Sequence, residues 1–228
     1  PKNSNLDLLI NYNDNEDENI IIYIDDNSNI NITELRQGLN IQGKLKYIII
    51  NNSTLIINKF CNINNVDEII DIELKGIDSN VEYYFSTLSV NNKKYKLNVY
   101  HKNINTKSNI YSRGISLISS NLEFDINGYI KRGSRESYLN QDSKIIMLED
   151  NKSIIKPNLF IDEDKVEAKH SSIVGRFSEE ELFYLKSRGI SKETAIKLLV
   201  KAFLLGKLTI DDKTRYEILK IIDSHWRW

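Results

Sequence analysis

The chain contains three histidines and one cysteine, so it offers few imidazole or thiolate ligands for a transition metal. His170 stands in the small-residue stretch VEAKHSSIVG, just before a strongly predicted helix. A neutral imidazole there could bind iron, with its second ring nitrogen held by a carboxylate or a carbonyl. The alternative is that His170 only forms a hydrogen bond across a subunit contact.

The other candidate residues have simpler interpretations. Cys61 lies in KFCNINN, and a free cysteine is most often a small buried hydrophobe. As the only cysteine, it excludes an intramolecular disulfide and any multi-cysteine metal site built by this chain alone, and it fits a reducing compartment. We interpret His101 as a structural histidine, the acids at 162–164 as solvated loop residues and those at 178–181 as helix-start residues.

Charge and hydropathy exclude several classes of protein. The chain carries 31 basic and 32 acidic residues, and it has no local basic stripe, so we expect neither nucleic acid nor an anionic membrane as a partner. The opening PKNSNLDLL lacks the features of a signal peptide, and no apolar run approaches the ~20 residues of a membrane span. We therefore expect a location in the cytoplasm or in an organelle stroma or matrix.

Short apolar runs that are typical of β-strands recur through the first two thirds of the chain. They are IIIYI (20–24), YIII (47–50), TLII (54–57) and IIDIEL (69–74). In KYKLNVY (94–100), residues alternate so that Tyr95, Leu97 and Val99 share one face. Asparagine, aspartate, serine and glycine fill the gaps, and they supply the left-handed and side-chain-bonded conformations of tight turns.

Many short strands indicate an all-β sandwich, a barrel or a solenoid. Asn127-Gly128 is the one clear dipeptide of a two-residue hairpin, so a series of antiparallel hairpins has little support. A solenoid of stacked parallel strands fits the spacing somewhat better. Every asparagine lies within residues 1–158, so the composition changes near Pro157.

From Ser178 onward the pattern is helical. Ser178 and Glu181 form a capping box at the start of a helix that Gly189 is placed to end. A second helix follows the cap Ser191, and a third begins near Asp212 and ends near the tail HWRW.

The join between strands and helices resembles a known family. The run KHSSIVGRFSEEELFYLKSRGISKETAIKLLVKAF is similar to the C-terminal signature of the SufB/SufD family, which belongs to the SUF machinery of iron–sulfur cluster assembly. The segments HKNINTKSNIYSRGI (101–115) and SYLNQDSKIIMLEDNKSIIKPNLFI (137–161) resemble two further parts of that family. The likeness extends over about residues 95–205.

This resemblance implies a right-handed parallel β-helix, residues 1–176, followed by a small C-terminal helical domain, residues 177–228. SufB-type scaffolds carry a glutamate after the motif histidine and a cysteine a short way upstream of it. Here Ser171 follows His170, and residues 130–165 contain no cysteine. The chain therefore resembles SufD, an accessory and non-catalytic subunit.

The resemblance also implies a site and partners. His170 would lie at the interface with a SufB-like paralogue and would bind iron or a nascent iron–sulfur cluster transiently, while this chain alone would hold no cofactor stably. The helical domain would dock a SufC-type ATPase, which performs the ATP hydrolysis because this chain has no G-x-x-x-x-G-K-[ST] motif. The expected docking residues are Phe183, Tyr184, Leu185, Arg188 and Gly189.

Three alternatives stay open. The residues at 183–185 could serve as a cap on the end of the solenoid and nothing more, because an uncovered end can pair edge to edge with another chain. The chain could form a homodimeric scaffold that performs both the SufB and the SufD role. It could also be an exported-type β-helix carbohydrate lyase or hydrolase, which would gather carboxylates on one face of the solenoid.

Overall fold

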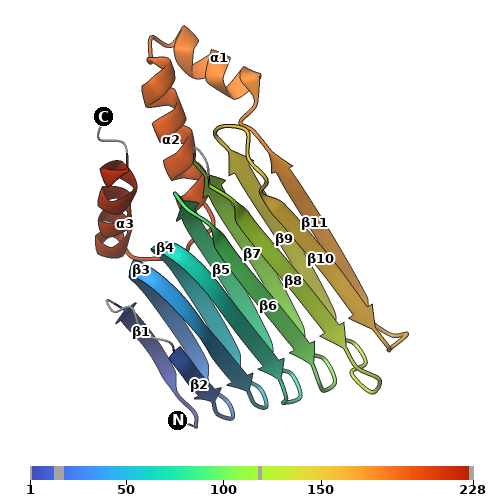
Figure 1. The fold of residues 1–228 in the computed structure, drawn as a ribbon. Helices are drawn as coiled ribbons and strands as arrows, with labels where there is room; N and C mark the ends of the chain where they lie inside the picture. The colour runs from blue at the N-terminus through green and yellow to red at the C-terminus, as the bar shows by residue number, and fades with distance from the viewer. Residues whose placement is uncertain (1, 13–17, 118–119, 226–228) are drawn as a thin grey trace.

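The computed structural model describes residues 2–12, 18–117 and 120–225, in which eleven strands precede three helices (Figure 1). The strands are β1 (Asn5–Tyr12), β2 (Glu18–Ile24), β3 (Asn29–Ile49), β4 (Thr54–Leu74), β5 (Asn80–Ser89), β6 (Lys93–His101), β7 (Lys107–Ser116), β8 (Leu122–Ile130), β9 (Tyr138–Met147), β10 (Ile154–Ile161) and β11 (Glu167–Gly175). All pairings among these described strands are parallel.

The strands form two columns, and the chain passes from one column to the other on each turn. The first column contains β1, the first halves of β3 and β4, and then β5, β7, β9 and β11. The second contains β2, the second halves of β3 and β4, and then β6, β8 and β10. This arrangement is a parallel β-solenoid, so the predicted fold class is confirmed.

Alternation along each strand places one set of side chains inside the solenoid. In β6 the predicted face is confirmed, because Tyr95, Leu97 and Val99 are all at most 2% exposed. The sequence pattern suggested separate strands at 54–57 and 69–74, but both lie in β4, which continues through the corner between the columns. The apolar pattern did not reveal this continuity, because three of the four corner residues at 62–65 are asparagines and the buried Ile63 stands alone among them.

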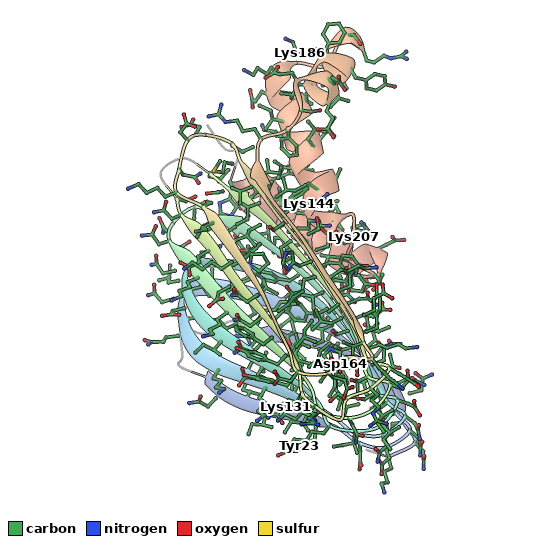
Figure 2. The ribbon with its side chains drawn as sticks, turned by 90° about the vertical axis from the view of Figure 1, so that its right-hand side faces the viewer. Tyr23, Lys131, Lys144, Asp164, Lys186 and Lys207 are labelled. Atoms are coloured by element: carbon green, nitrogen blue, oxygen red, sulfur yellow. The ribbon has the colours of Figure 1, made fainter. Side chains whose placement is uncertain are left out.

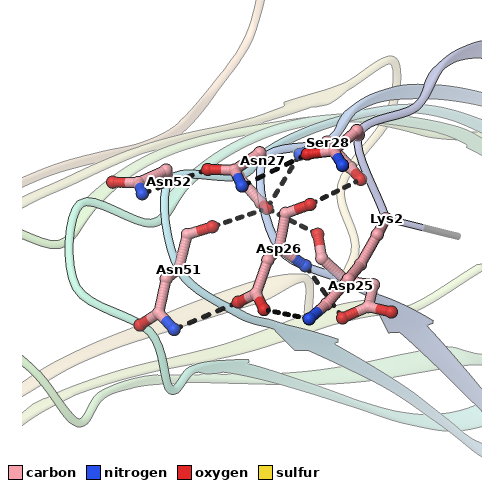
Figure 3. A network of polar contacts seen from close by, with 9 residues as sticks. Lys2, Asp25, Asp26, Asn27, Ser28, Asn51 and Asn52 are labelled. Atoms are coloured by element: carbon pink, nitrogen blue, oxygen red, sulfur yellow. Dashed lines mark hydrogen bonds and ion pairs between the residues drawn. The ribbon is translucent and has the colours of Figure 1, made fainter.

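Left-handed residues form the corners between the second column and the first. Asn27, Asn52, Asp78 and Asn105 all have a φ between 53° and 57°, so the expected turn conformations are confirmed. Their side chains join successive turns of the solenoid, since the Asn27 amide donates to Asn3 (3.2 Å) and the Asn52 amide donates to Asn27 (3.1 Å). Figure 3 shows this corner.

The Asn127-Gly128 dipeptide is not a turn, because it lies inside β8. A Cβ atom at Gly128 would approach Leu139 Cδ1 to 2.4 Å, so glycine is required there by packing between the columns. On the outer face, Asn127 belongs to a ladder of amides in which Asn158 donates to Asn127 and Asn127 donates to Asn98. The hairpin suggested by this dipeptide is therefore wrong.

The helices are α1 (Glu179–Ser187), α2 (Lys192–Leu205) and α3 (Asp212–Ser224). The capping box of Ser178 and Glu181 is confirmed, as is the cap formed by Ser191. α3 ends next to the HWRW tail, of which residues 226–228 lie outside the described residues.

Two of the helices share a core with the outer face of the first column. Val200 and Leu204 of α2 and Ile218 of α3 belong to one buried cluster with Phe60 and Ile115. The Ser86 hydroxyl also donates to the carbonyl of Leu204 (2.5 Å). The helices are therefore fixed to the solenoid, and the predicted division into two domains at residue 176 stays a prediction.

Helix α1 and the loops after β8 and β10 lie at opposite ends of the molecule. Figure 2 shows Lys186 of α1 at one end, and Lys131 and Asp164, from the loops after β8 and β10, toward the other. No helix in the described part of the chain is long and apolar enough to cross a membrane.

Candidate functional site

The solenoid has an open end at β10 and β11, since each of these strands has only one hydrogen-bonded neighbour. The N–H of Asp162 donates to the carbonyl of Ile130 in β8, and that of Glu167 donates to the carbonyl of Ser137, the residue before β9. The backbone N–H and C=O groups of successive residues in a strand point in opposite directions. In β11 the groups of the even-numbered residues therefore point toward the open edge, and in β10 those of the odd-numbered residues do. Pro157 occupies such a position in β10, where its missing N–H removes no bond to β8.

The residues with unpaired backbone groups also point their side chains toward the solenoid interior. They are Ala168, His170, Ser172 and Val174 in β11, and Ile155, Pro157, Leu159 and Ile161 in β10. Several of them are exposed although their counterparts in earlier turns are buried; Val174, for example, is 39% exposed whereas its register partner Ile145 is fully buried. The open end therefore combines unpaired backbone groups with an uncovered apolar interior.

His170 lies in the middle of this open end. Its register partner is Gln141 in β9, so the imidazole belongs to an inward-facing row. His170 is exposed and has no hydrogen-bond partner among residues 2–12, 18–117 and 120–225. An accessible imidazole without a competing partner can take a metal or a proton from outside the chain.

The described residues offer no complete metal site of their own. Among them, no group of three or more histidine, cysteine, aspartate or glutamate side chains is arranged to hold a metal ion.

Cys61 is remote from the open end. It points inward from β4, four strands away from β11 in the first column, and it is buried as expected. Burial raises the pKa of its thiol. Burial also lowers the pKa of the neighbouring Lys93 to about 8, and the Lys93 ammonium donates to the carbonyl of Leu88 (2.5 Å). The thiol is thus part of the core rather than of the candidate site.

His101 is a structural histidine, as predicted. Its Nδ1 lies 2.7 Å from the Thr106 hydroxyl and its Nε2 lies 2.8 Å from the Ser108 hydroxyl, inside a corner of the solenoid. Burial lowers the pKa of His101 to about 3. The ring therefore stays neutral and joins two turns of the chain.

A pH dependence follows from the lowered pKa of His101. The unfolded chain protonates this histidine near pH 6.5, whereas the folded chain resists protonation to about pH 3, so stability is complete above pH 6.5 and falls as the pH decreases. Between pH 7.5 and pH 5 we expect His101 to account for a loss of about 2 kcal/mol in the free energy of unfolding. Urea titrations should show a smaller loss for His101→Asn, and an equal loss in both proteins would contradict this assignment.

The acids at 162–164 lie in the loop between β10 and β11. This loop lines a cleft of about 600 Å³ together with Arg132, Arg135 and Lys165. The N–H of Gly133 donates to Glu163 (2.8 Å) and lowers the pKa of that carboxyl. The carboxylates are thus balanced by neighbouring donors and cations, in keeping with a solvated loop.

The predicted docking residues lie on and just after α1, which has no buried residue. Phe183 is 73% exposed and Tyr184 is 59% exposed, while Leu185 is half-buried. The Arg188 guanidinium lies 5.5 Å from the centre of the Tyr184 ring, and the exposed Gly189 adopts a φ of 80°. Because Phe183 and Tyr184 remain exposed, and β11 as well, these residues do not seal the open end.

A buried ion network inside the solenoid was not predicted from the sequence. The Lys59 ammonium lies 2.6 Å from a Glu68 oxygen, and Arg36 lies 3.6 Å from Glu34 and 3.5 Å from Glu68. The Tyr47 hydroxyl donates to Glu34. Each charged side chain in the network is at most 2% exposed. Glu34 and Arg36 lie on the same face of β3 as Ile30 and Ile32. Alternation with these apolar residues could have predicted that both charged side chains point inward.

Comparison with protein families matches residues 2–203 to the SufBD core domain of the SUF system for iron–sulfur cluster assembly. The chain belongs to the SufBD family. The match covers the solenoid and continues into α2, so it includes the open end and the exposed helix α1.

Three relatives have similar segments. The chain is 38% identical over 96 residues to the iron–sulfur cluster assembly protein SufD of Bacillus subtilis, covering 42% of this chain and 22% of that protein. It is 56% identical over 58 residues to a SufBD family protein of Mycobacterium leprae, covering 24% and 15%. It is 33% identical over 81 residues to the chloroplastic protein ABCI7 of Arabidopsis thaliana, covering 35% and 17%. The aligned segments thus span only 15–22% of these three relatives.

Proposed function

We propose that this SufBD protein is an accessory, SufD-like subunit of a SUF-type complex and performs no catalysis itself. It pairs with a SufB-like scaffold through β10 and β11, docks a SufC-type ATPase through α1, and presents His170 to iron or a nascent cluster. The observation that carries the proposal is the open end, where unpaired backbone, uncovered apolar side chains and an unpartnered histidine meet.

Strand addition is the mode of pairing that best suits this end. On the outer face, the rings of Tyr100, Tyr129 and Phe160 stack at 4.7 Å between successive centroids. Phe160 belongs to β10 and is 49% exposed. A partner strand along β10 would cover Phe160, and one along β11 would satisfy the backbone groups around His170. Such pairing would add the partner's strands to the two columns of the solenoid.

The cysteine content favours the SufD-like role over a scaffold that holds the cluster. Cys61 is the only cysteine, and it is buried in β4, far from the open end. Ser171, which follows His170, lies on the outer face of β11 and cannot bind iron as a glutamate would. In this proposal the thiolate and carboxylate ligands come from the SufB-like partner, in a reducing compartment, and the cluster is cargo rather than a resident cofactor.

The helices provide a route from the ATPase to the open end. α1 exposes Phe183 and Tyr184, an apolar surface suited to a protein partner. α2 and α3 share a core with the first column, so a displacement of the helices moves the strands with them. ATP-dependent motion of a SufC-type ATPase would thereby shift the two paired solenoids and open the site near His170.

The alternatives have less support. A carbohydrate enzyme would need free carboxylates gathered on one face, but on the outer face of β4 Asp71 pairs with Lys44 (2.8 Å) and Glu73 pairs with Lys46 (2.8 Å). Although burial opposes ionisation, the neighbouring lysines lower the pKa of Glu73 to about 2. The family match gives this alternative no support. A homodimer would place two copies of His170 together but would bring no cysteine to the open end.

One co-purification experiment tests both proposed surfaces. The chain is co-expressed with a SufB-like and a SufC-like protein, and each partner is quantified after affinity purification. We expect Ser172→Pro to lower recovery of the SufB-like partner about tenfold, because it removes an open-edge N–H and leaves a partner acceptor unpaired at about 1–3 kcal/mol. We expect Phe183→Ser to lower recovery of the SufC-like partner instead.

Ser171→Pro is the matched control, because the N–H of Ser171 points toward β9 and its loss weakens the fold itself. The thermal midpoint of each variant separates the two effects. Full recovery of both partners with a folded Ser172→Pro variant would contradict pairing through β11.

A further inference from the structure

Gln141 is a buried side chain whose position in the solenoid is unexpected. It faces the interior from β9 and is 1% exposed, among apolar neighbours such as Leu139 on the same face. Its Nε2 lies 3.5 Å from the carbonyl of Asn158 in β10, so the amide group reaches across to the second column. The bare Cα of Gly128 provides the room, since a Cβ there would lie 3.0 Å from Nε2.

The Oε1 atom of Gln141 has no hydrogen-bond partner within the part of the chain that the structure describes. A buried acceptor without a donor costs roughly 1–3 kcal/mol, so such an atom calls for an explanation. His170 is the register partner of Gln141 and lies on the same inward row, one strand further along the first column. Its imidazole carries an N–H donor on the strand that pairs with β9.

We propose that Gln141 is a positioning residue for His170: when the exposed imidazole turns toward its register partner, Oε1 accepts a hydrogen bond from one imidazole N–H and so selects the tautomer whose other nitrogen faces the open end. This inference rests on the proposed role of His170 as a ligand. The buried glutamine does not touch the metal; it holds the imidazole with its lone pair directed outward, as an outer-shell acceptor does in metal sites. The interaction involves neutral groups only, so burial costs less than for a carboxylate in the same place.

The tautomer of His170 tests the proposal without any bound metal. Imidazole ¹⁵N shifts distinguish a single tautomer, with two well-separated nitrogen signals, from a mixture, and the chain has only three histidines to assign. At a pH of about 8.5, where ordinary imidazoles are neutral, we expect two well-separated His170 signals in the wild type. In Gln141→Met, which keeps the length but loses the acceptor, the separation should shrink toward that of free histidine.

Two further variants complete the design. Gln141→Asn keeps a neutral amide acceptor but shortens the side chain by one methylene, so it should restore the single tautomer only in part. Ser112→Ala also removes a buried polar group without a partner, the Ser112 hydroxyl in β7, which lies one strand farther from β11 than Gln141. This variant should leave the His170 signals unchanged. His101 is an internal reference, because both of its ring nitrogens are bonded within the chain.

The stability of the variants separates positioning from a structural role. Because the proposed bond joins Oε1 to an exposed side chain at the open end, its loss should leave the thermal midpoint of Gln141→Met close to that of the wild type. If that variant failed to fold, Gln141→Leu would provide the same comparison. Identical His170 signals in the wild type and in the folded Met or Leu variant would overturn the proposal, whatever the iron content of the assembled complex. If the His170 signals differed between the wild type and Gln141→Met as expected, but no iron bound at His170, only the proposed function would be overturned.

Discussion

Replacing Lys59 by methionine is expected to lower the free energy of unfolding by about 3–5 kcal/mol, the largest single effect on stability that the structure suggests. Lys59 is completely buried and contacts both oxygens of Glu68, at 2.6 and 2.7 Å, and one oxygen of Glu34 at 3.7 Å. With Lys59 removed, Arg36 would be the only cation left in the network for two buried carboxylates. Urea titration at pH 7 measures the loss.

Two control variants make this prediction specific. Lys156→Met removes a lysine that pairs with Glu123 at 2.7 Å but is 48% exposed, and it should cost less than about 1 kcal/mol. The double variant Lys59→Met/Glu68→Leu removes a complete pair and should recover most of the lost stability, because no uncompensated charge remains. A loss below about 1 kcal/mol for Lys59→Met alone would show that the buried charges are solvated or rearranged.

The regular parts of the fold were accessible from sequence because local physical rules determine them. The helix starts at Ser178 and Ser191 follow from capping chemistry, and both are confirmed. The inward face of β6 follows from alternation, since Tyr95 and Leu97 are separated from their neighbours by polar residues. The family resemblance was needed to predict a solenoid instead of a sandwich. The small number of hairpin dipeptides in the sequence is only weak evidence against antiparallel strands.

Features that depend on register across turns were not accessible from sequence. Asn127-Gly128 reads as a hairpin, yet its glycine is required because Leu139 arrives from the opposite column. Local sequence carries no information about that approach. The same limit applies to β11, where His170 faces inward while apolar Ile173 faces outward, so polarity does not reveal the inward face.

The candidate site was predicted in part. The position of His170 next to the helical segment and its chemical interest came from the sequence and the family resemblance. Its exposure in the last turn, its pairing with Gln141 and the unpaired edge around it required the register of eleven strands in the described chain. The proposed pairing through β11 and the proposed role of Gln141 both depend on these features.

Replacing His170 by alanine is expected to remove most of the iron and sulfide from the assembled complex while leaving the chain folded. The side chain is exposed and has no hydrogen-bond partner in the described ranges, so its loss should cost well under ~2 kcal/mol. The methyl group of alanine cannot replace an imidazole nitrogen as a ligand. Pairing through β11 depends on backbone groups, which this variant keeps, so partner recovery should match the wild type.

We propose that His170, at the open end of the solenoid, contributes to the iron–sulfur site between this chain and a SufB-like partner. The most direct measurement is the amount of iron and acid-labile sulfide per complex, after anaerobic co-purification with SufB-like and SufC-like partners. We expect a decrease of about tenfold or more for His170→Ala and wild-type values for Ser171→Ala, whose side chain lies on the outer face. An intact His170→Ala complex with wild-type iron and sulfide would contradict the claim.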